Sequence, residues 1–536
     1  MSEAMAQNVT TASNGFLAFV AEDVKQSPKM YLTGLALLLS VFFLQKLSSP
    51  SLDEREPPFL KPGIPVIGHL IGMMKHHGGY FQILFDKTRA RIGTLPILGG
   101  KLYIIFEPSM VQSAYRNKNL AFEPFAVEFA QRELAISNES ARIVRETNLV
   151  PDFFSVITKS MAGEYTHRMN ANALKYVSKE LETLGSSEPM KIPNLYLWVR
   201  DMMTIATTEA LYGPDNPIKG NPGLLEDLWT FEAGLTGILL NVFPSITARA
   251  AHYARARLQA ALGKYYGAKK DHHEDAAQIV KSRATVLRNY GILGAEVGTF
   301  ELALLHVSTA NTIPTLFWFM AQIYARPELV SRLREEVVPV AQHGDDNEVT
   351  IDITTLDQKC PLLVSCYREA IRLSNQTVGN RRVMEDTTIS DGKGSSYLLK
   401  KGLNVQMSAQ VLHTLHSVWG NDVMEFDPER FIEKGGKENL QSDRAKRTSF
   451  APFGGGRHLC PGRNFAFAEN LGLMTSLLLG FDVLPLDQDY TAFKVPSMKA
   501  CVFSEAAGKP ENEGQGFGVQ IQKKKGWEKT KWRFVS

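Results

Sequence analysis

The feature that most constrains this chain is a glycine-rich run that leads into a cysteine, Phe453-Gly-Gly-Gly-Arg-His-Leu-Cys460-Pro-Gly462. Glycine adopts positive φ and lets the backbone approach a bulky group closely, so we expect this of the glycines at 454, 455, 456 and 462. The apolar-rich segment 464–474 predicts a helix, whose N-terminal amides and dipole favour an anionic sulfur just ahead of it. The run therefore predicts that Cys460 is a thiolate ligand to a metal in a large, flat cofactor.

The same run resembles the haem-binding signature of the cytochrome P450 family, Phe-x-x-Gly-x-(Arg/His)-x-Cys-x-Gly. Phe453, Gly456, His458, Cys460 and Gly462 fill its fixed positions. The resemblance implies heme b with its iron ligated by Cys460 and the other four residues around the cofactor. A thiolate pushes electron density onto haem iron and favours O–O cleavage. The alternative is a buried structural cysteine in a glycine-rich loop.

Length and composition set the limits of the fold. The 536 residues are 44% hydrophobic, enough for a large core, and length alone would suggest several domains. The resemblance instead implies one catalytic domain, residues 69–536, mainly α with small β-sheets. A net charge of +3 predicts no nucleic-acid partner. Four cysteines do not make a disulfide scaffold and fit a reducing compartment.

The N-terminal part carries a membrane signal. Residues 30–44 contain no charged side chain, and we expect a transmembrane anchor over 30–47. A stiff Pro/Gly hinge follows at 48–68. The order resembles that of single-pass endoplasmic-reticulum cytochromes P450, which implies a cytosolic catalytic domain and a lumenal segment 1–29. Asn8 would then be a glycosylation acceptor. The alternative is a buried or interfacial helix.

Two further motifs predict a buried charge network. Glu369 and Arg372 are three residues apart on a predicted helix, so they lie on one face and can pair, as in the family's Glu-x-x-Arg. Arg430 lies in Pro-Glu-Arg-Phe, another family motif. The resemblance implies that the three side chains form a network that holds the thiolate loop, and breaking it from one side is costly.

The segment 300–320 predicts the oxygen-binding helix, but it departs from the family's (Ala/Gly)-Gly-x-(Asp/Glu)-Thr pattern. Ala310 stands in place of the acid and Asn311 in place of the alcohol. Pro314 has no amide hydrogen, which frees the carbonyl of Ala310 and predicts a kink there. Asn311 can donate and accept hydrogen bonds to position oxygen, and Thr312 is the nearest alcohol.

The run Ala-Asn-Thr-Ile-Pro is similar to that of sterol 7α-hydroxylases and prostacyclin synthases. This resemblance implies a bulky, polycyclic or lipid-like substrate. The other interpretation of Asn311 is a satisfied polar residue in a helix kink. We expect Val307 and Ala310, together with Val378 from the segment 376–380, to line the substrate pocket.

Haem propionates need cationic partners. The family position for such an arginine falls on Arg382, with its neighbour Arg381 in reserve, and His458 is the other candidate. The family's Trp-x-x-x-Arg motif is missing, and three residues remain open as its replacement, namely Lys159, His167 and Arg168.

The sequence thus predicts a haem-thiolate monooxygenase that oxidises a terpenoid, steroid or related specialised metabolite with O2. The electron donor must act in trans, since no reductase sequence is fused to the chain. We expect NADPH–cytochrome P450 reductase, with cytochrome b5 as an optional second donor. The basic segment 433–447 would help an acidic reductase to dock, or is a solvated loop. One alternative is an isomerase like prostacyclin synthase, which needs neither O2 nor NADPH. Another is a non-catalytic haem-binding membrane protein.

Overall fold

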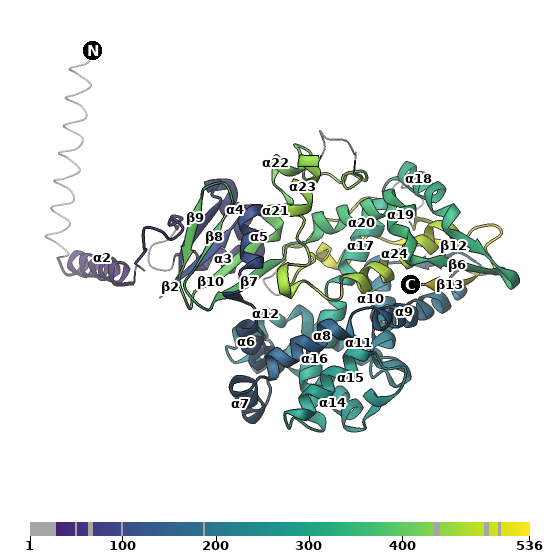
Figure 1. Ribbon diagram of the computed structural model, residues 1–536, viewed down its shortest axis with the longest axis horizontal. Helices are drawn as coiled ribbons and strands as arrows, with labels where there is room; N and C mark the ends of the chain where they lie inside the picture. Colours follow the sequence, from purple (N-terminus) through teal and green to yellow (C-terminus); the bar gives the residue numbers. More distant parts are fainter. Residues whose placement is uncertain are drawn as a thin grey trace, which may run out of the picture.

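Helices dominate the structure, a computed structural model that describes residues 28–48, 51–62, 68–97, 100–185, 188–433, 440–486, 493–501 and 505–536. Small sheets accompany them, one of which forms a separate layer at one end of the molecule (Figure 1). The prediction of a mainly α fold with small β-sheets is confirmed.

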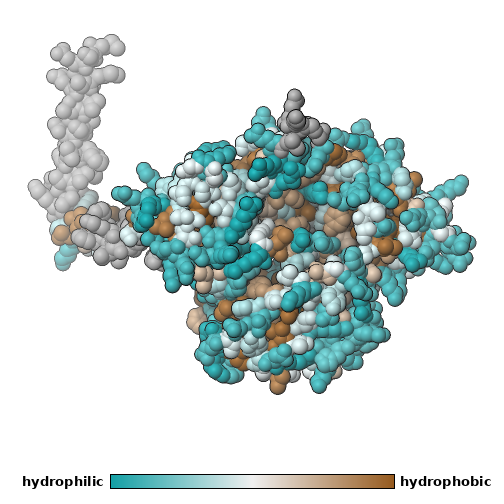
Figure 2. Space-filling view, in the orientation of Figure 1, coloured by the Kyte–Doolittle hydropathy of each residue, from teal (hydrophilic) through white to brown (hydrophobic). Residues whose placement is uncertain are grey.

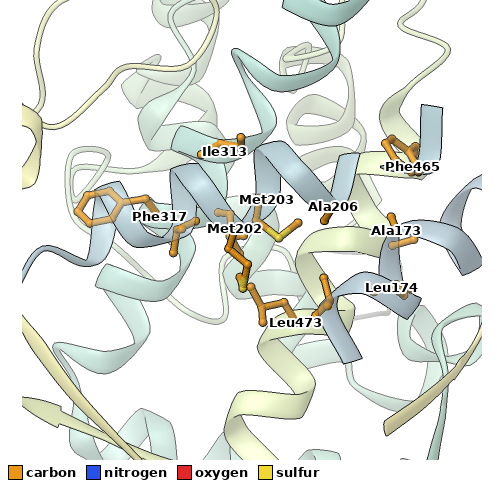
Figure 3. Close-up of a cluster of buried hydrophobic side chains, with 14 of the residues drawn as sticks. Ala173, Leu174, Met202, Met203, Ala206, Ile313, Phe317, Phe465 and Leu473 are labelled. Atoms are coloured by element: carbon orange, nitrogen blue, oxygen red, sulfur yellow. The ribbon is translucent and has the colours of Figure 1, made fainter. Parts of the chain in front are cut away.

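The core is built by helices that pack through apolar residues at helical spacing. Figure 3 shows where α9 (Glu164–Thr183), α10 (Leu195–Tyr212), α17 (Thr312–Tyr324) and α24 (Arg463–Gly480) meet. The contacting side chains are buried and close-packed, and they include Ala173, Leu174, Met202, Met203, Ala206, Ile313, Phe317, Phe465 and Leu473. Helix α24 starts directly after the predicted thiolate loop. Because α24 is packed in the core, it fixes the position of the end of that loop.

The other described α-helices are distributed over the rest of the molecule (Figure 1). They are α2 (Pro28–Ser48), α3 (Leu70–His76), α4 (Tyr80–Thr88), α5 (Pro108–Arg116), α6 (Glu123–Leu134), α7 (Asn138–Glu146), α8 (Leu149–Ser160), α11 (Pro222–Ala233), α12 (Leu235–Leu240), α13 (Pro244–Thr247), α14 (Arg249–Gly267), α15 (Gln278–Asn289), α16 (Ala295–Thr309), α18 (Pro327–Val337), α19 (Leu356–Lys359), α20 (Pro361–Ser374), α21 (Ala409–His413), α22 (His416–Trp419) and α23 (Leu440–Ser449).

The largest sheet has the order β1-β2-β10-β7-β3, in which β10 and β2 are parallel and the other pairs antiparallel. Its strands are β1 (Ile92–Ile97), β2 (Gly100–Ile105), β3 (Leu120–Ala121), β7 (Val378–Val383) and β10 (Asn404–Ser408). Two three-stranded sheets follow, β11 (Phe481–Pro485)-β12 (Val519–Lys523)-β4 (Met190–Ile192) and β13 (Lys531–Val535)-β6 (Glu348–Asp352)-β5 (Ala341–His343). Strands β8 (Thr387–Ser390) and β9 (Ser396–Leu399) form a hairpin.

The predicted anchor, residues 30–47, falls within helix α2, whose side chains are described only as far as Ser40. Over the described residues, we find no helix that is both long and apolar enough to cross a membrane. Asn8 and most of the predicted lumenal segment lie outside the described residues, as do positions 49–50 and 63–67 of the predicted hinge.

The described part of the hinge is attached to the large sheet. Backbone hydrogen bonds join Leu60 N to Thr94 O at 3.0 Å and Thr94 N to Pro58 O at 2.8 Å. The Glu56 carboxylate is buried and accepts hydrogen bonds from the Tyr103 hydroxyl and from Lys101 Nζ. The connector is thus fixed by main-chain pairing and by one buried carboxylate.

Candidate functional site

A cavity of about 890 Å³ lies between the thiolate loop, helices α6, α8, α16 and α17, and the start of β7. Most of the residues that line it are apolar. On the face seen in Figure 2, hydrophilic residues cover the edges, and hydrophobic ones show toward the recessed middle. Small-molecule and cofactor sites span about 300–1,000 Å³, so this cavity, at about 890 Å³, is near the upper end of their range.

Cys460 lines the cavity directly before α24. Its backbone amide donates to the Phe453 carbonyl at 3.0 Å, which closes the loop, and Phe453 also lines the cavity. Burial raises the pKa of the Cys460 thiol, whereas the amides of Gly462 and Arg463 and the Arg463 charge lower it. The N-terminal amides of α24 thus lower the pKa of the thiol, as the sequence predicts. The effect of burial is larger, so the pKa of the thiol is raised overall.

The glycines of the loop have different roles. Gly454 and Gly456 adopt positive φ, at 70° and 65°, whereas Gly455 has an extended φ of −172° and Gly462 a helical φ of −78°. The expectation of positive φ is therefore right for two of the four. Gly456 does not line the cavity, contrary to the prediction that it lies at the cofactor. A Cβ there would lie 2.1 Å from the Tyr115 carbonyl oxygen, so only glycine fits this close contact. Its role is to let the loop pack against α5.

The structure places Arg381, not Arg382, on the cavity. Side chains alternate along β7, and Arg382 points away, donating to Asn404 Oδ1 at 2.7 Å and Glu128 Oε1 at 3.0 Å. Arg381 is 5% exposed and donates to the Gly455 carbonyl at 3.2 Å. The prediction that Arg382 is the cationic partner of a propionate is therefore corrected to its neighbour, Arg381.

His458 lies on the cavity beside Arg457. Its Nε2 is 3.4 Å from Glu123 Oε2, and Arg457, which also lines the cavity, has Nε 3.0 Å from His458 Nε2. The His458 hydrogen bond, followed by the charges of His458 and Arg457, lowers the pKa of Glu123 to about 2. Arg457 escaped prediction because it occupies a variable position of the motif.

None of the three open replacements for the missing arginine lines the cavity, and Arg168 pairs with Asp275 at 3.4 Å instead. The described basic side chains on the thiolate side are therefore those of Arg381, Arg457 and His458. They suit the carboxylates of a cofactor.

The predicted charge network is formed and buried. Glu369 accepts from Arg372 Nε and Nη2, both at 2.7 Å, and from Arg430 Nε at 2.9 Å. Arg430 also donates to the Trp419 carbonyl at 2.6 Å, and Arg372 to the Val423 carbonyl at 2.7 Å. The network thus joins α20 to the segment that leads to the thiolate loop.

The predicted helix kink is confirmed. Helix α16 ends at Thr309 and α17 begins at Thr312, with Asn311 at φ −109° between them. The Oδ1 of Asn311 accepts hydrogen bonds from the amides of Ala506 at 3.0 Å and Ala507 at 3.3 Å. Asn311 also lines the cavity, and its Nδ2 has no partner among the described residues. Asn311 therefore holds the C-terminal loop with one atom and presents a donor with the other.

Only some residues of the kinked helix line the cavity, because a helix presents one face to it. Val307, Asn311 and Thr312 line the cavity, as does Val378 on β7, whereas Ala310 does not. The prediction for Ala310 is thus wrong. The Thr312 hydroxyl is buried and has no hydrogen-bond partner within the described parts of the chain. Such an orphaned group indicates a missing ligand or water.

These residues fit a thiolate-ligated haem. No group of three or more His, Cys, Asp or Glu side chains that could hold a metal ion occurs among the described residues. A metal bound at Cys460 would therefore take its other ligands from a cofactor. Of the described cysteines, Cys460 alone lines the cavity, with cations beside it for carboxylates.

Comparisons with known proteins agree with this geometry. The protein-family model described as Cytochrome P450 matches residues 292–505. A Cytochrome P450 monooxygenase of Gibberella zeae is 44% identical over 510 residues, covering 95% of this chain and 97% of the relative. Cytochrome P450 monooxygenase nodJ of Hypoxylon pulicicidum is 28% identical, covering 90% and 93% of the two chains.

More distant relatives include Cytochrome P450 7B1 of Mus musculus, at 25% identity over 84% of this chain and 89% of the relative. Among solved structures, the chain titled "Retinoic acid bound cyanobacterial CYP120A1" superposes with a TM-score of 0.64. It is 18% identical, with 89% of this chain and 100% of that chain covered, and it supports the fold alone.

Proposed function

Since this chain belongs to the cytochrome P450 family and is a monooxygenase with a cysteine-ligated haem, we propose that it oxidises a bulky, lipophilic terpenoid, steroid or related specialised metabolite. The observation that carries the proposal is the large cavity, which is lined mostly by apolar residues and also by Cys460. A relative named 25-hydroxycholesterol 7-alpha-hydroxylase, from Rattus norvegicus, is 32% identical over 39% of this chain and supports the steroid class.

Each site residue has a separate role in this proposal. Cys460 would hold the iron, and Arg381, Arg457 and His458 would bind the cofactor's carboxylates. When bound, the haem supplies oxygen activation. The Nδ2 of Asn311 donates a hydrogen bond into the cavity, and the Thr312 hydroxyl relays a proton there in place of the family's acid and alcohol.

Electrons come from a reductase in trans, for which we propose NADPH–cytochrome P450 reductase with cytochrome b5 as an optional donor. We also propose an endoplasmic-reticulum membrane location through residues 30–47, with the catalytic domain in the cytosol. In support, Leu32, Leu35 and Leu38 of α2 are exposed. Pelleting of the full chain with microsomal membranes, and its loss on deletion of 30–47, tests this location.

A second candidate function is an isomerase like prostacyclin synthase. It is favoured by one observation, the replacement of the acid–alcohol pair by Ala310 and Asn311 at a kinked helix. An isomerase would turn over a peroxide substrate without reductase. NADPH-dependent consumption of O2 in the presence of substrate separates the two functions.

The deciding experiment is the carbon monoxide difference spectrum of the reduced protein beside Cys460→Ala. We expect the long-wavelength band for which the family is named in the wild type and its loss in the variant. Cys360→Ala is the matched control, since Cys360 is buried away from the cavity. A band of imidazole-ligated haem in the wild type would contradict the assignment of Cys460.

A further inference from the structure

The cavity contains a carboxylate that the haem site does not use. Two acidic side chains, Glu123 and Glu133, occur among the described residues that line it. Glu123 is engaged by His458 and Arg457 on the thiolate side. Glu133, on α6, accepts a hydrogen bond through Oε1 from His306 Nδ1 at 3.1 Å. Its Oε2 has no partner in the described part of the chain.

The segment around Glu133 is held by α14 in addition to the contact from His306 on α16. Arg255 of α14 donates through Nη1 to the carbonyls of Arg132 and Glu133, both at 3.2 Å. Gln259, also of α14, donates to the Leu134 carbonyl at 2.6 Å. These contacts satisfy the free carbonyls at the end of α6 and place a cation at its negative pole. The carboxylate is therefore fixed before any ligand binds, which lowers the entropic cost of binding.

This carboxylate already has a partner within the protein, because Glu133 Oε1 lies 3.1 Å from His306 Nδ1. His306 is buried, which lowers its pKa, but the hydrogen bond and charge of Glu133 raise it, and the overall shift is upward. With a basic side chain already beside the carboxylate, a cationic ligand is not required. Glu133 lines the cavity and its side chain is 15% exposed, so Oε2 can accept a further hydrogen bond from a ligand. A neutral O–H donor would satisfy Oε2 without adding a charge.

We propose that Glu133, positioned by His306, determines specificity by accepting a hydrogen bond from a neutral hydroxyl group of the substrate. The inference rests on the proposed function and narrows its substrate class. The substrate is a terpenoid or steroid alcohol rather than a hydrocarbon. Its hydroxyl binds at α6 and α16, while another part of the molecule faces the thiolate side of the cavity.

The test compares alcohols with their own ethers. A panel of terpenoid and steroid alcohols, each with its methyl ether and its deoxy counterpart, is titrated into the haem-loaded full chain. Affinity is measured from the change in haem absorbance and, independently, from the ligand-induced shift in thermal unfolding. We expect the best-bound alcohol to bind about tenfold more tightly than its ether, because hydrogen bonds to charged groups are strong.

Glu133→Gln tests the assignment. The amide oxygen still accepts from His306, while the amide nitrogen faces the ligand and donates to a hydroxyl or an ether oxygen alike. The alcohol-to-ether affinity ratio should therefore fall to about one. Glu128→Gln is the matched control on the same helix, because Glu128 does not line the cavity and pairs with Arg382. It should keep the wild-type ratio. Glu133→Asp, which keeps the charge, should retain part of the preference.

Two results would overturn the proposal. The first is that the wild-type protein binds every alcohol of the panel no more tightly than its ether. The second is that Glu133→Gln keeps the wild-type ratio of alcohol affinity to ether affinity. The carbon monoxide spectrum of each preparation separates this failure from a failure of the proposed function. A thiolate-haem band without alcohol preference rejects only the role of Glu133, whereas absence of that band in the wild type rejects the proposed function itself.

Discussion

Glu469 is a carboxylate buried in α24, far from water. One oxygen accepts from the Thr207 hydroxyl at 2.9 Å, and the other, Oε2, has no partner among the described residues. Burial raises its pKa from the ordinary 4.5 to about 8. Between these two pKa values the folded protein keeps a proton on Glu469 that the unfolded chain loses. The stability that this proton contributes is fully present below pH 4.5 and is lost as the pH rises toward about 8.

We predict that the free energy of unfolding falls between pH 6 and pH 8 by about 1.4 kcal/mol per pH unit relative to Glu469→Gln, which stays neutral. Urea unfolding at several pH values measures the difference. Glu335→Gln, at an exposed position, should keep the wild-type slope. Parallel profiles for wild type and Glu469→Gln would show that Glu469 is ionised in the folded state.

At the scale of elements, the break between α16 and α17 is coupled to the C-terminal loop by Asn311. We predict that Asn311→Leu, which removes the acceptor of the Ala506 and Ala507 amides, makes these amides exchange with solvent about tenfold faster. Hydrogen–deuterium exchange measures this directly. Unchanged exchange at both amides would contradict the coupling.

The control is Thr315→Val, one turn along α17. The Thr315 hydroxyl donates to the Asn311 carbonyl at 2.8 Å, and Thr315 also lines the cavity, but its hydroxyl makes no hydrogen bond to the described residues of the loop. Exchange at Ala506 and Ala507 should therefore stay at the wild-type rate in this variant.

The elements also show what sequence can and cannot predict. The thiolate loop, the charge network and the kink follow from local spacing, since a proline or an i, i+3 pair acts within one turn. The choice between Arg381 and Arg382 depends on the pairing of β7 with β10, which sets Arg382 opposite Asn404. The position of Ala310 depends on how the broken helix faces the cavity. The pair of Glu133 and His306 is 173 residues apart in sequence, and no motif marks it.

At the scale of the whole molecule, Glu56 fixes the N-terminal connector to the body of the protein. We predict that Glu56→Ala, which leaves Lys101 and Tyr103 without their buried acceptor, destabilises this attachment by about 1–3 kcal/mol. Trypsin should then cleave faster at Arg55 and Lys61, as followed by mass spectrometry of the full chain.

Glu54→Ala provides the comparison for this prediction. Glu54 lies two residues away on the same segment but is exposed. Its replacement should leave the cleavage rate unchanged. Equal rates for the two variants would mean that main-chain pairing with Thr94 holds the connector without help from the carboxylate.

The network of Glu369, Arg372 and Arg430 constrains how this protein can diverge over time. Loss of Glu369 leaves the buried Arg372 without its ion-pair partner, which costs about 3–5 kcal/mol, and loss of either arginine leaves Glu369 with one ion pair instead of two. Replacing all three by apolar residues is, in contrast, close to neutral. Single substitutions therefore lead through a poorly folded intermediate. Descendants of this sequence should keep the three residues together or lose them together, and the positions that change freely should be found elsewhere.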